Sequence, residues 1–254
     1  KSSREFIAEN RILRRIAPEA LDQNDGLFAA ISDADMAHRE AFMDKCAASG
    51  IPAKEIPPAT AMQLAPNLNP DVITAFRVPD ATLDAWRLPL YFYATAKANG
   101  ARIHNFSQAI GFQKSNGTIT GVRIFDHQTE REYDVSGDLF VNAAGAWAGK
   151  ICALADIPLP IQPGPGVMVA VEPRLTDMVI NRLHQAGEGD IIVPQRELSV
   201  LGTTLWLAED PDRIESPSDH VQKIIDLCAQ MVPAVKEKAI RSVWSASRPL
   251  IEQK

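Results

Sequence analysis

The sequence predicts an α/β region combined with an α+β region that contains a mixed sheet. Three observations favour this fold class. The apolar residues 139–141 show no polar alternation, as in a strand covered on both faces, and they run into the small residues 143–146 before a helix. The dipeptide Asn116-Gly117 is a strong turn signal between two strand-like segments. Six Pro and Gly residues within positions 158–166 mark a crossing between domains.

The first hundred residues alternate between helical and strand-like patterns. Ser32 and Asp84 are expected to cap the amino ends of two helices, because their side-chain oxygens can accept hydrogen bonds from the first turn. Gly50 and Gly100 are the expected stops. The expected elements are helix 3–17, strand 27–31, helix 33–49, a helical turn 58–65, strand 72–78 and helix 85–99.

The remaining chain predicts two groups of strands, one on each side of the Pro- and Gly-rich crossing. Before the crossing we expect a small antiparallel meander of strands 101–112 and 118–125 with one near Tyr133, then the buried strand 139–141 and a helix after Trp147. Beyond it we expect strands 167–171, 190–193, 198–203 and 240–244, with a helix over 218–231 capped by Ser216 or Ser218.

The composition excludes several classes of protein. With 46% hydrophobic and 23% charged residues, the chain of 254 residues is average for a globular protein, and no apolar run approaches the roughly 20 residues that span a bilayer. The net charge of -6 and scattered Lys and Arg disfavour nucleic-acid binding. Three Cys and five His are dispersed, so we expect neither a disulfide framework nor a metal site. No signal peptide is visible after Lys1, which favours a reducing, cytoplasmic location.

Short motifs leave few chemical options open. Residues 145–150 superficially resemble a phosphate-binding loop, but the glycine spacing is short and Ile151 replaces the magnesium-binding hydroxyl, so we exclude an NTPase. No Gly-x-Ser-x-Gly elbow supports a hydrolase. Thr203 and Thr204 end a strand and could contact a polar ligand, although Thr is common in strands. The guanidinium of Arg248 suits a phosphate or a carboxylate, and equally a surface salt bridge.

Seven segments together carry a resemblance to a known family: 8–17, 24–28, 78–88, 141–147, 179–182, 201–204 and 248–250. In this order they resemble the FAD-dependent glycerol-3-phosphate dehydrogenases, and specifically the catalytic subunit of the anaerobic bacterial type. The Asn-Ala-Ala-Gly-x-Trp segment is shared with a wider flavoprotein superfamily that includes amino-acid oxidases. The Pro-Asp-x-Thr-x-Asp and Gly-Thr-Thr segments favour the glycerol-phosphate branch.

The resemblance implies a partial Rossmann-like FAD domain at 1–20 and 80–157, and a mixed-sheet substrate (cap) domain at 21–79 and 158–254. It implies cofactor-binding residues at Ala109, Ala143, Ala144, Gly145 and Trp147, and substrate-binding residues at Arg248, Thr203 and Thr204. Arg248 falls on an arginine that binds the substrate phosphate. No metal is implied within the chain.

The activity implied by the resemblance is oxidation of sn-glycerol 3-phosphate to dihydroxyacetone phosphate by hydride transfer to FAD. Electrons then reach membrane quinone through an iron-sulphur partner subunit. The enzyme is expected in the cytoplasm, held at the inner face of the cell membrane only by that partner.

The family's amino-terminal Gly-x-Gly-x-x-Gly unit and its carboxy-terminal Gly-Gly-Lys segment are not found in residues 1–254. We therefore expect a fragment that neither holds FAD nor turns over substrate alone. Methionine at 168 stands near a histidine of some aerobic relatives and cannot accept a proton, so no catalytic base is assigned. Two alternatives stay open: a related FAD-dependent amino-acid or 2-hydroxy-acid oxidoreductase, in which Arg248 holds a carboxylate, and a non-catalytic binding or assembly module.

Overall fold

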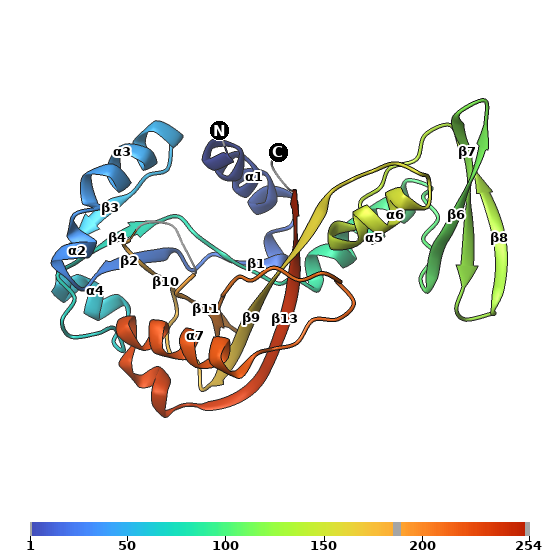
Figure 1. The fold of residues 1–254 in the computed structure, drawn as a ribbon. Coiled ribbons are helices and arrows are strands. Elements are labelled where there is room, and N and C mark those ends of the chain that lie inside the picture. Colours follow the sequence, from blue (N-terminus) through green and yellow to red (C-terminus); the bar gives the residue numbers. More distant parts are fainter. Residues whose placement is uncertain (1, 185–188, 252–254) are drawn as a thin grey trace. The chain divides into compact units, whose positions relative to one another are not determined.

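The computed structural model describes residues 2–184 and 189–251, which form two compact units (Figure 1). The first unit consists of residues 1–94, 166–205 and 215–245. The second consists of residues 95–165, 206–214 and 246–254. The division into a cofactor domain and a cap at the boundaries given above remains a proposal.

An eight-stranded mixed sheet organises the first unit (Figure 1). Its strands, in spatial order, are β13 (Ala239–Ile251), β9 (Ile161–Glu172), β12 (Leu198–Gly202), β11 (Ile191–Gln195), β10 (Val179–Arg182), β2 (Gly26–Ala30), β4 (Thr74–Val78) and β3 (Lys54–Ile56). Strands β10 and β2 are parallel, whereas the pairs β9–β12, β12–β11, β11–β10, β2–β4 and β4–β3 are antiparallel. Strands β9 and β13 continue into the second unit.

Helices and short elements complete the first unit. They are α1 (Ser2–Ile16), a 3-10 turn (Pro18–Ala20), β1 (Leu21–Asp22) paired with β5 (Thr82–Leu83), α2 (Asp33–Met36), α3 (Arg39–Ser49), α4 (Pro58–Leu64), α7 (Ser218–Met231) and a 3-10 turn (Pro233–Glu237). Helix α5 (Arg87–Ala98) begins here and ends in the second unit. Fully buried side chains such as Leu27, Phe76 and Ile192 form the core along the sheet.

The second unit contains a three-stranded antiparallel sheet of β6 (Ser107–Ser115), β7 (Thr118–Asp126) and β8 (Arg131–Ser136). Asn116 and Gly117 join β6 to β7 with φ angles of 51° and 78°, the left-handed values that a tight hairpin turn requires. A 3-10 turn (Gly145–Trp147) leads into α6 (Ala148–Ala153). The meander and the mixed sheet confirm the predicted fold class.

Four local predictions are wrong. Residues 139–141 form no strand, and Leu139 and Val141 are 82% and 81% exposed. A strand buried on both faces needs neighbours on both sides, and no strand in the described parts of the chain pairs with this segment. The helix expected over 33–49 breaks between α2 and α3, the first meander strand begins at Ser107, and Pro217 rather than a serine caps α7.

Candidate functional site

The side chain of Asn142 stabilises the turn of small residues 143–146 that precedes α6. Its Oδ1 accepts a hydrogen bond from the backbone N–H of Ala144 at 3.1 Å, and its Nδ2 donates to the carbonyl of Ala148 at 2.9 Å. Gly145 has a φ of 56°, and a Cβ added to it would meet nothing within 4 Å. The turn therefore presents backbone and small side chains with open space beside Gly145.

A cavity of about 500 Å³ in the second unit adjoins this turn. Strands β6 and β7, the segment 140–144, helix α6 and the residues that follow it supply the lining: Ala109, Phe112, Ile119, Val122, Ile124, Phe140, Val141, Asn142, Ala143, Ala144, Ile151, Cys152, Ala155 and Ile157. Its size falls within the range of small-molecule sites, which runs from roughly 300 to 1,000 Å³. The apolar walls with one amide suit a flat aromatic group.

The structure brings three of the five predicted cofactor-binding residues to this cavity. Ala109 enters from β6, whereas Ala143 and Ala144 belong to the turn. Gly145 and Trp147 follow directly in the chain but do not line the cavity. The roles predicted for all five residues stay predictions. Asn142 was missed, although its place directly before two alanines and a glycine was visible in the sequence.

A charged cluster lies at the start of α6. Trp147 Nε1 donates to Asp212 Oδ1 at 2.7 Å, and Lys150 Nζ contacts Asp210 Oδ1 at 2.6 Å and Asp212 Oδ2 at 2.5 Å. Hydrogen bonds from Lys150 hold the pKa of both carboxyls below the ordinary value of 3.8, and the same contacts raise the pKa of Lys150. Lys150, Asp210 and Asp212 were not among the residues predicted from the sequence.

The two predicted substrate threonines lie in the first unit, directly after β12. Thr204 is completely buried, and its hydroxyl accepts a hydrogen bond from the N–H of Val167 at 3.3 Å and lies 2.9 Å from His220 Nδ1. The hydroxyl of Thr203 donates to the carbonyl of Thr204 at 3.2 Å. Both hydroxyls thus have partners within the protein, and their role in binding substrate stays a prediction.

Arg248 lies on the part of β13 that belongs to the second unit, and its side chain is exposed. Its Nη1 is 3.5 Å from the carbonyl oxygen of Gly164. The preceding residue, Ser247, has a buried hydroxyl oxygen for which the described residues supply no hydrogen-bond partner. Since the threonines and Arg248 belong to different units, they do not form one local cluster within either unit.

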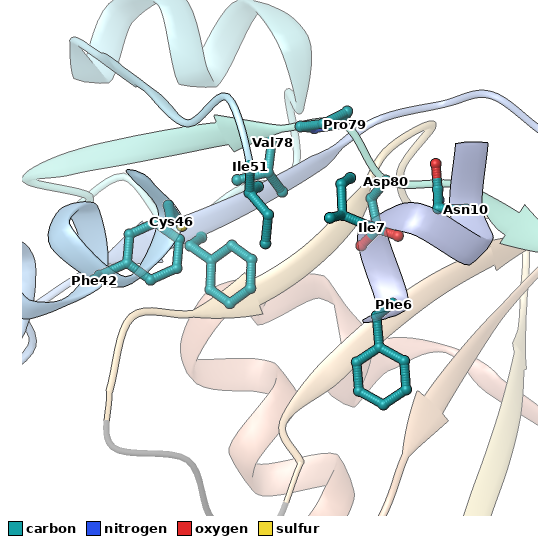
Figure 2. Close-up of a pocket in the computed structure, with 10 residues that line it drawn as sticks. Phe6, Ile7, Asn10, Phe42, Cys46, Ile51, Val78, Pro79 and Asp80 are labelled. Atoms are coloured by element: carbon teal, nitrogen blue, oxygen red, sulfur yellow. The ribbon is translucent and has the colours of Figure 1, made fainter. Parts of the chain in front are cut away.

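A second cavity, of about 280 Å³, lies in the first unit (Figure 2). Residues of α1, β2 and α3, the loop after α3, and the end of β4 with the two residues after it line this cavity: Phe6, Ile7, Asn10, Phe28, Phe42, Cys46, Ile51, Val78, Pro79 and Asp80. Asp80 Oδ1 accepts a hydrogen bond from the N–H of Ala81 at 2.8 Å. Burial raises the pKa of the Asp80 carboxyl. This cavity was not predicted from the sequence.

Within residues 2–184 and 189–251, no three or more His, Cys, Asp or Glu side chains gather in a way that could hold a metal ion. No helix in the same residues is long and apolar enough to cross a bilayer.

Comparison with protein families and curated sequences gives consistent matches. The model of the FAD dependent oxidoreductase family (DAO) matches residues 1–254. The chain is 31% identical over 253 residues to one subunit of the anaerobic glycerol-3-phosphate dehydrogenase of Haemophilus influenzae, covering 99% of the chain and 45% of the relative. It is 35% identical over 262 residues to the corresponding subunit from Haloferax volcanii, covering 99% of the chain and 44% of the relative. The chain therefore spans less than half the length of these curated relatives.

Solved structures share the fold at lower sequence identity. L-proline dehydrogenase from P. horikoshii matches with a TM-score of 0.80 and 20% identity, over 96% of the chain and 66% of that protein. L-α-glycerophosphate oxidase from Mycoplasma pneumoniae, solved with FAD bound, matches with a TM-score of 0.79 and 15% identity, over 99% of the chain and 69% of that protein. At these identities the likeness establishes the fold alone.

Proposed function

Because the chain belongs to the FAD dependent oxidoreductase family, we propose that it is part of a longer flavoprotein that oxidises sn-glycerol 3-phosphate to dihydroxyacetone phosphate. The membership confirms the family resemblance carried by the sequence motifs, with FAD as the family's cofactor. The observation that carries the proposal is 31% and 35% identity, along 99% of the chain, to two anaerobic glycerol-3-phosphate dehydrogenase subunits.

The residues of the second unit fit one end of FAD. The cavity of about 500 Å³ has apolar walls for a flat ring system, and the small side chains of Ala143 and Ala144 leave the adjoining backbone accessible. Open space beside Gly145 lets a ligand approach the turn closely. We propose that Ala109, Ala143 and Ala144 contact the cofactor through backbone groups, and that Gly145 and Trp147 flank it.

Bound FAD supplies an acceptor for the hydride that leaves C2 of the substrate, while the C2 hydroxyl loses its proton. The chain's own contribution is to bind and orient. The planar guanidinium of Arg248 can donate two parallel hydrogen bonds to a phosphate group, and its residue is exposed on β13. We propose that Thr203 and Thr204, which follow β12 of the eight-stranded sheet, lie at the substrate-binding site.

The curated relatives are named as subunits, which favours further subunits here. We propose an iron-sulphur partner that carries electrons to membrane quinone and holds the enzyme at the cytoplasmic face of the membrane. We also propose that residues 1–20 and 80–157 belong to the cofactor domain, and that 21–79 and 158–254 form the cap.

The test is substitution of Arg248 in the complete protein. We expect Arg248→Ala to raise the dissociation constant for glycerol 3-phosphate at least about tenfold, because a charged hydrogen-bonded partner is lost. Arg248→Lys keeps the positive charge but loses the planar pair of donors, so its loss of affinity for glycerol 3-phosphate is expected to be intermediate. The control is Arg131→Ala, which removes an exposed arginine of β8. Unchanged affinity in Arg248→Ala contradicts the assignment.

A carboxylate substrate is the second enzymatic candidate. Several solved structures of the same fold are named for amino-acid oxidation, including L-proline dehydrogenase and glycine oxidase. A guanidinium pairs with a carboxylate as readily as with a phosphate. Measured binding of glycerol 3-phosphate against glycine and proline by the complete protein separates the two substrates.

An assembly module is the candidate of another class. Leu139 and Val141 are more than four-fifths exposed, and Phe6 is 72% exposed. Large exposed apolar side chains favour a surface that another part of the protein or another subunit covers. A complete protein that purifies without flavin and shows no thermal shift with FAD favours this candidate over the enzyme.

A further inference from the structure

Residues 206–214, which we name the strap, belong to the second unit, whereas the residues before and after them in the chain belong to the first unit. Its first half lies along the start of β9. Backbone N–H groups at Trp206 and Ala208 donate to carbonyl oxygens of β9 at 3.1 and 2.9 Å, and Gln162 Nε2 donates to the carbonyl of Ala208 at 2.7 Å. The strap is therefore anchored on β9 before it reaches α6.

The second half of the strap is a tight acidic turn. The N–H of Asp212 donates to Asp210 Oδ1 at 3.0 Å, and the buried Pro211 between them fixes the backbone. Both carboxylates therefore face the same cation, Lys150 of α6, at 2.6 and 2.5 Å. The other oxygen of Asp212 accepts the indole N–H of Trp147, so each oxygen of this carboxylate has a separate partner.

These contacts converge on the first residues after the small-residue turn. Trp147 ends the 3-10 turn that contains Gly145, and Lys150 follows within the first turn of α6. Asn142 holds the same turn from the cavity side. The side chain of Asn142 therefore stabilises the start of this turn, and Asp212 of the strap binds the residues that follow it.

We propose that Asp212 and Lys150 are positioning residues, which hold Trp147 and the turn 143–146 in the conformation that receives FAD. This inference rests on the proposed function. A turn that is already ordered loses less conformational freedom when a ligand binds, and this saving appears as tighter binding. Single exposed ion pairs contribute little to stability, so the contribution of the cluster is expected in ligand binding rather than in folding.

The cluster is expected to hold across neutral pH. The pKa of each strap carboxyl lies below its ordinary 3.8, so this contribution is present above 3.8 and is lost as pH falls through the lowered values. The pKa of Lys150 lies above its ordinary 10.5, so its contribution is present below 10.5 and is lost as pH rises through the raised value. Between pH 3.8 and 10.5, Asp210 and Asp212, which face Lys150, therefore stay ionised, and the neighbouring indole of Trp147 carries no charge.

The experiment measures the FAD dissociation constant of the complete protein by flavin fluorescence. We expect Asp212→Asn and Lys150→Met each to weaken FAD binding about threefold to tenfold, and the double variant to lose less than the product of the two. The matched control is Asp226→Asn, because Asp226 forms an exposed ion pair with Lys236 at 2.9 Å in the first unit. Its FAD binding is expected to be unchanged, and all variants without FAD are expected to unfold at similar temperatures.

The outcomes separate this inference from the proposed function. If the wild-type protein binds FAD and Asp212→Asn binds it as tightly as Asp226→Asn, the positioning role is wrong and the proposed function stands. If the wild-type protein does not bind FAD at all, both fall. If Asp212→Asn weakens FAD binding but Lys150→Met does not, the role of Lys150 is overturned and Asp212 acts through Trp147 alone.

Discussion

Replacing Gly145 with alanine tests the small-residue turn most sharply. Gly145 has a φ of 56°, and an added Cβ meets nothing within 4 Å, so the methyl group makes no clash within the protein. The remaining cost is backbone strain, about 1–2 kcal/mol for a left-handed alanine. In a folded unit of about 150–250 residues, each kcal/mol of such strain lowers the melting temperature by about 2–4 °C.

A ligand bound against the turn adds a second cost to Gly145→Ala, which appears in ligand affinity. If FAD occupies the open space beside Gly145, the methyl group of Gly145→Ala collides with it or displaces it, and FAD affinity falls at least about tenfold. Gly117→Ala is the matched control. Gly117 has a φ of 78°, its added Cβ also meets nothing within 4 Å, and it lies in the turn between β6 and β7.

The assay compares thermal unfolding without FAD and the FAD dissociation constants of the two variants of the complete protein. The expected result is a similar loss of stability in both, with weaker FAD binding in Gly145→Ala alone. Equal FAD dissociation constants refute the reasoning that the turn receives the cofactor.

Three further predictions concern the first unit and the thiols. Asp35→Ala removes the buried partner of Arg182 (Nε to Oδ1, 3.0 Å) and is expected to lower the free energy of unfolding in urea by about 2–4 kcal/mol; a loss below about 1 kcal/mol contradicts this. Because burial raises the pKa of Asp80, its ionisation destabilises the native state, so wild-type stability falls as pH rises from 3.8 through the raised value. Asp80→Asn is expected to gain stability relative to wild type as pH rises over that range. A difference in melting temperature between the two proteins that does not change with pH contradicts this. Burial raises the pKa of Cys228, so a thiol reagent should label the more exposed Cys152 in the native protein and Cys228 only after unfolding.

Elements defined by local rules were predictable from the sequence. Helix α7 has the predicted bounds, 218–231, because its amphipathic pattern ends at Val232, whose backbone is not helical and which precedes Pro233. Ser32 caps α2 through its hydroxyl, and Gly50 ends α3 with a φ of 72°. In each case the chemistry that sets the boundary lies within a few residues of it.

Features set by distant partners were not predictable. The apolar run 139–141 looked like a buried strand, but pairing depends on residues elsewhere in the chain, and Leu139 and Val141 are exposed. Ala109, Ala143 and Ala144 were found through the family resemblance, because alanine has no chemistry of its own to mark a site. Lys150 and Asp212 were missed because their contact joins positions 62 residues apart.

The central claim is that the complete protein passes electrons from glycerol 3-phosphate to FAD. Its most direct test is the absorbance spectrum of the purified complete protein, recorded without oxygen before and after addition of glycerol 3-phosphate. The account predicts an oxidised flavin spectrum that bleaches on addition, with one dihydroxyacetone phosphate formed per flavin reduced. A protein without flavin, or a flavin that glycine or proline bleaches and glycerol 3-phosphate does not, contradicts it.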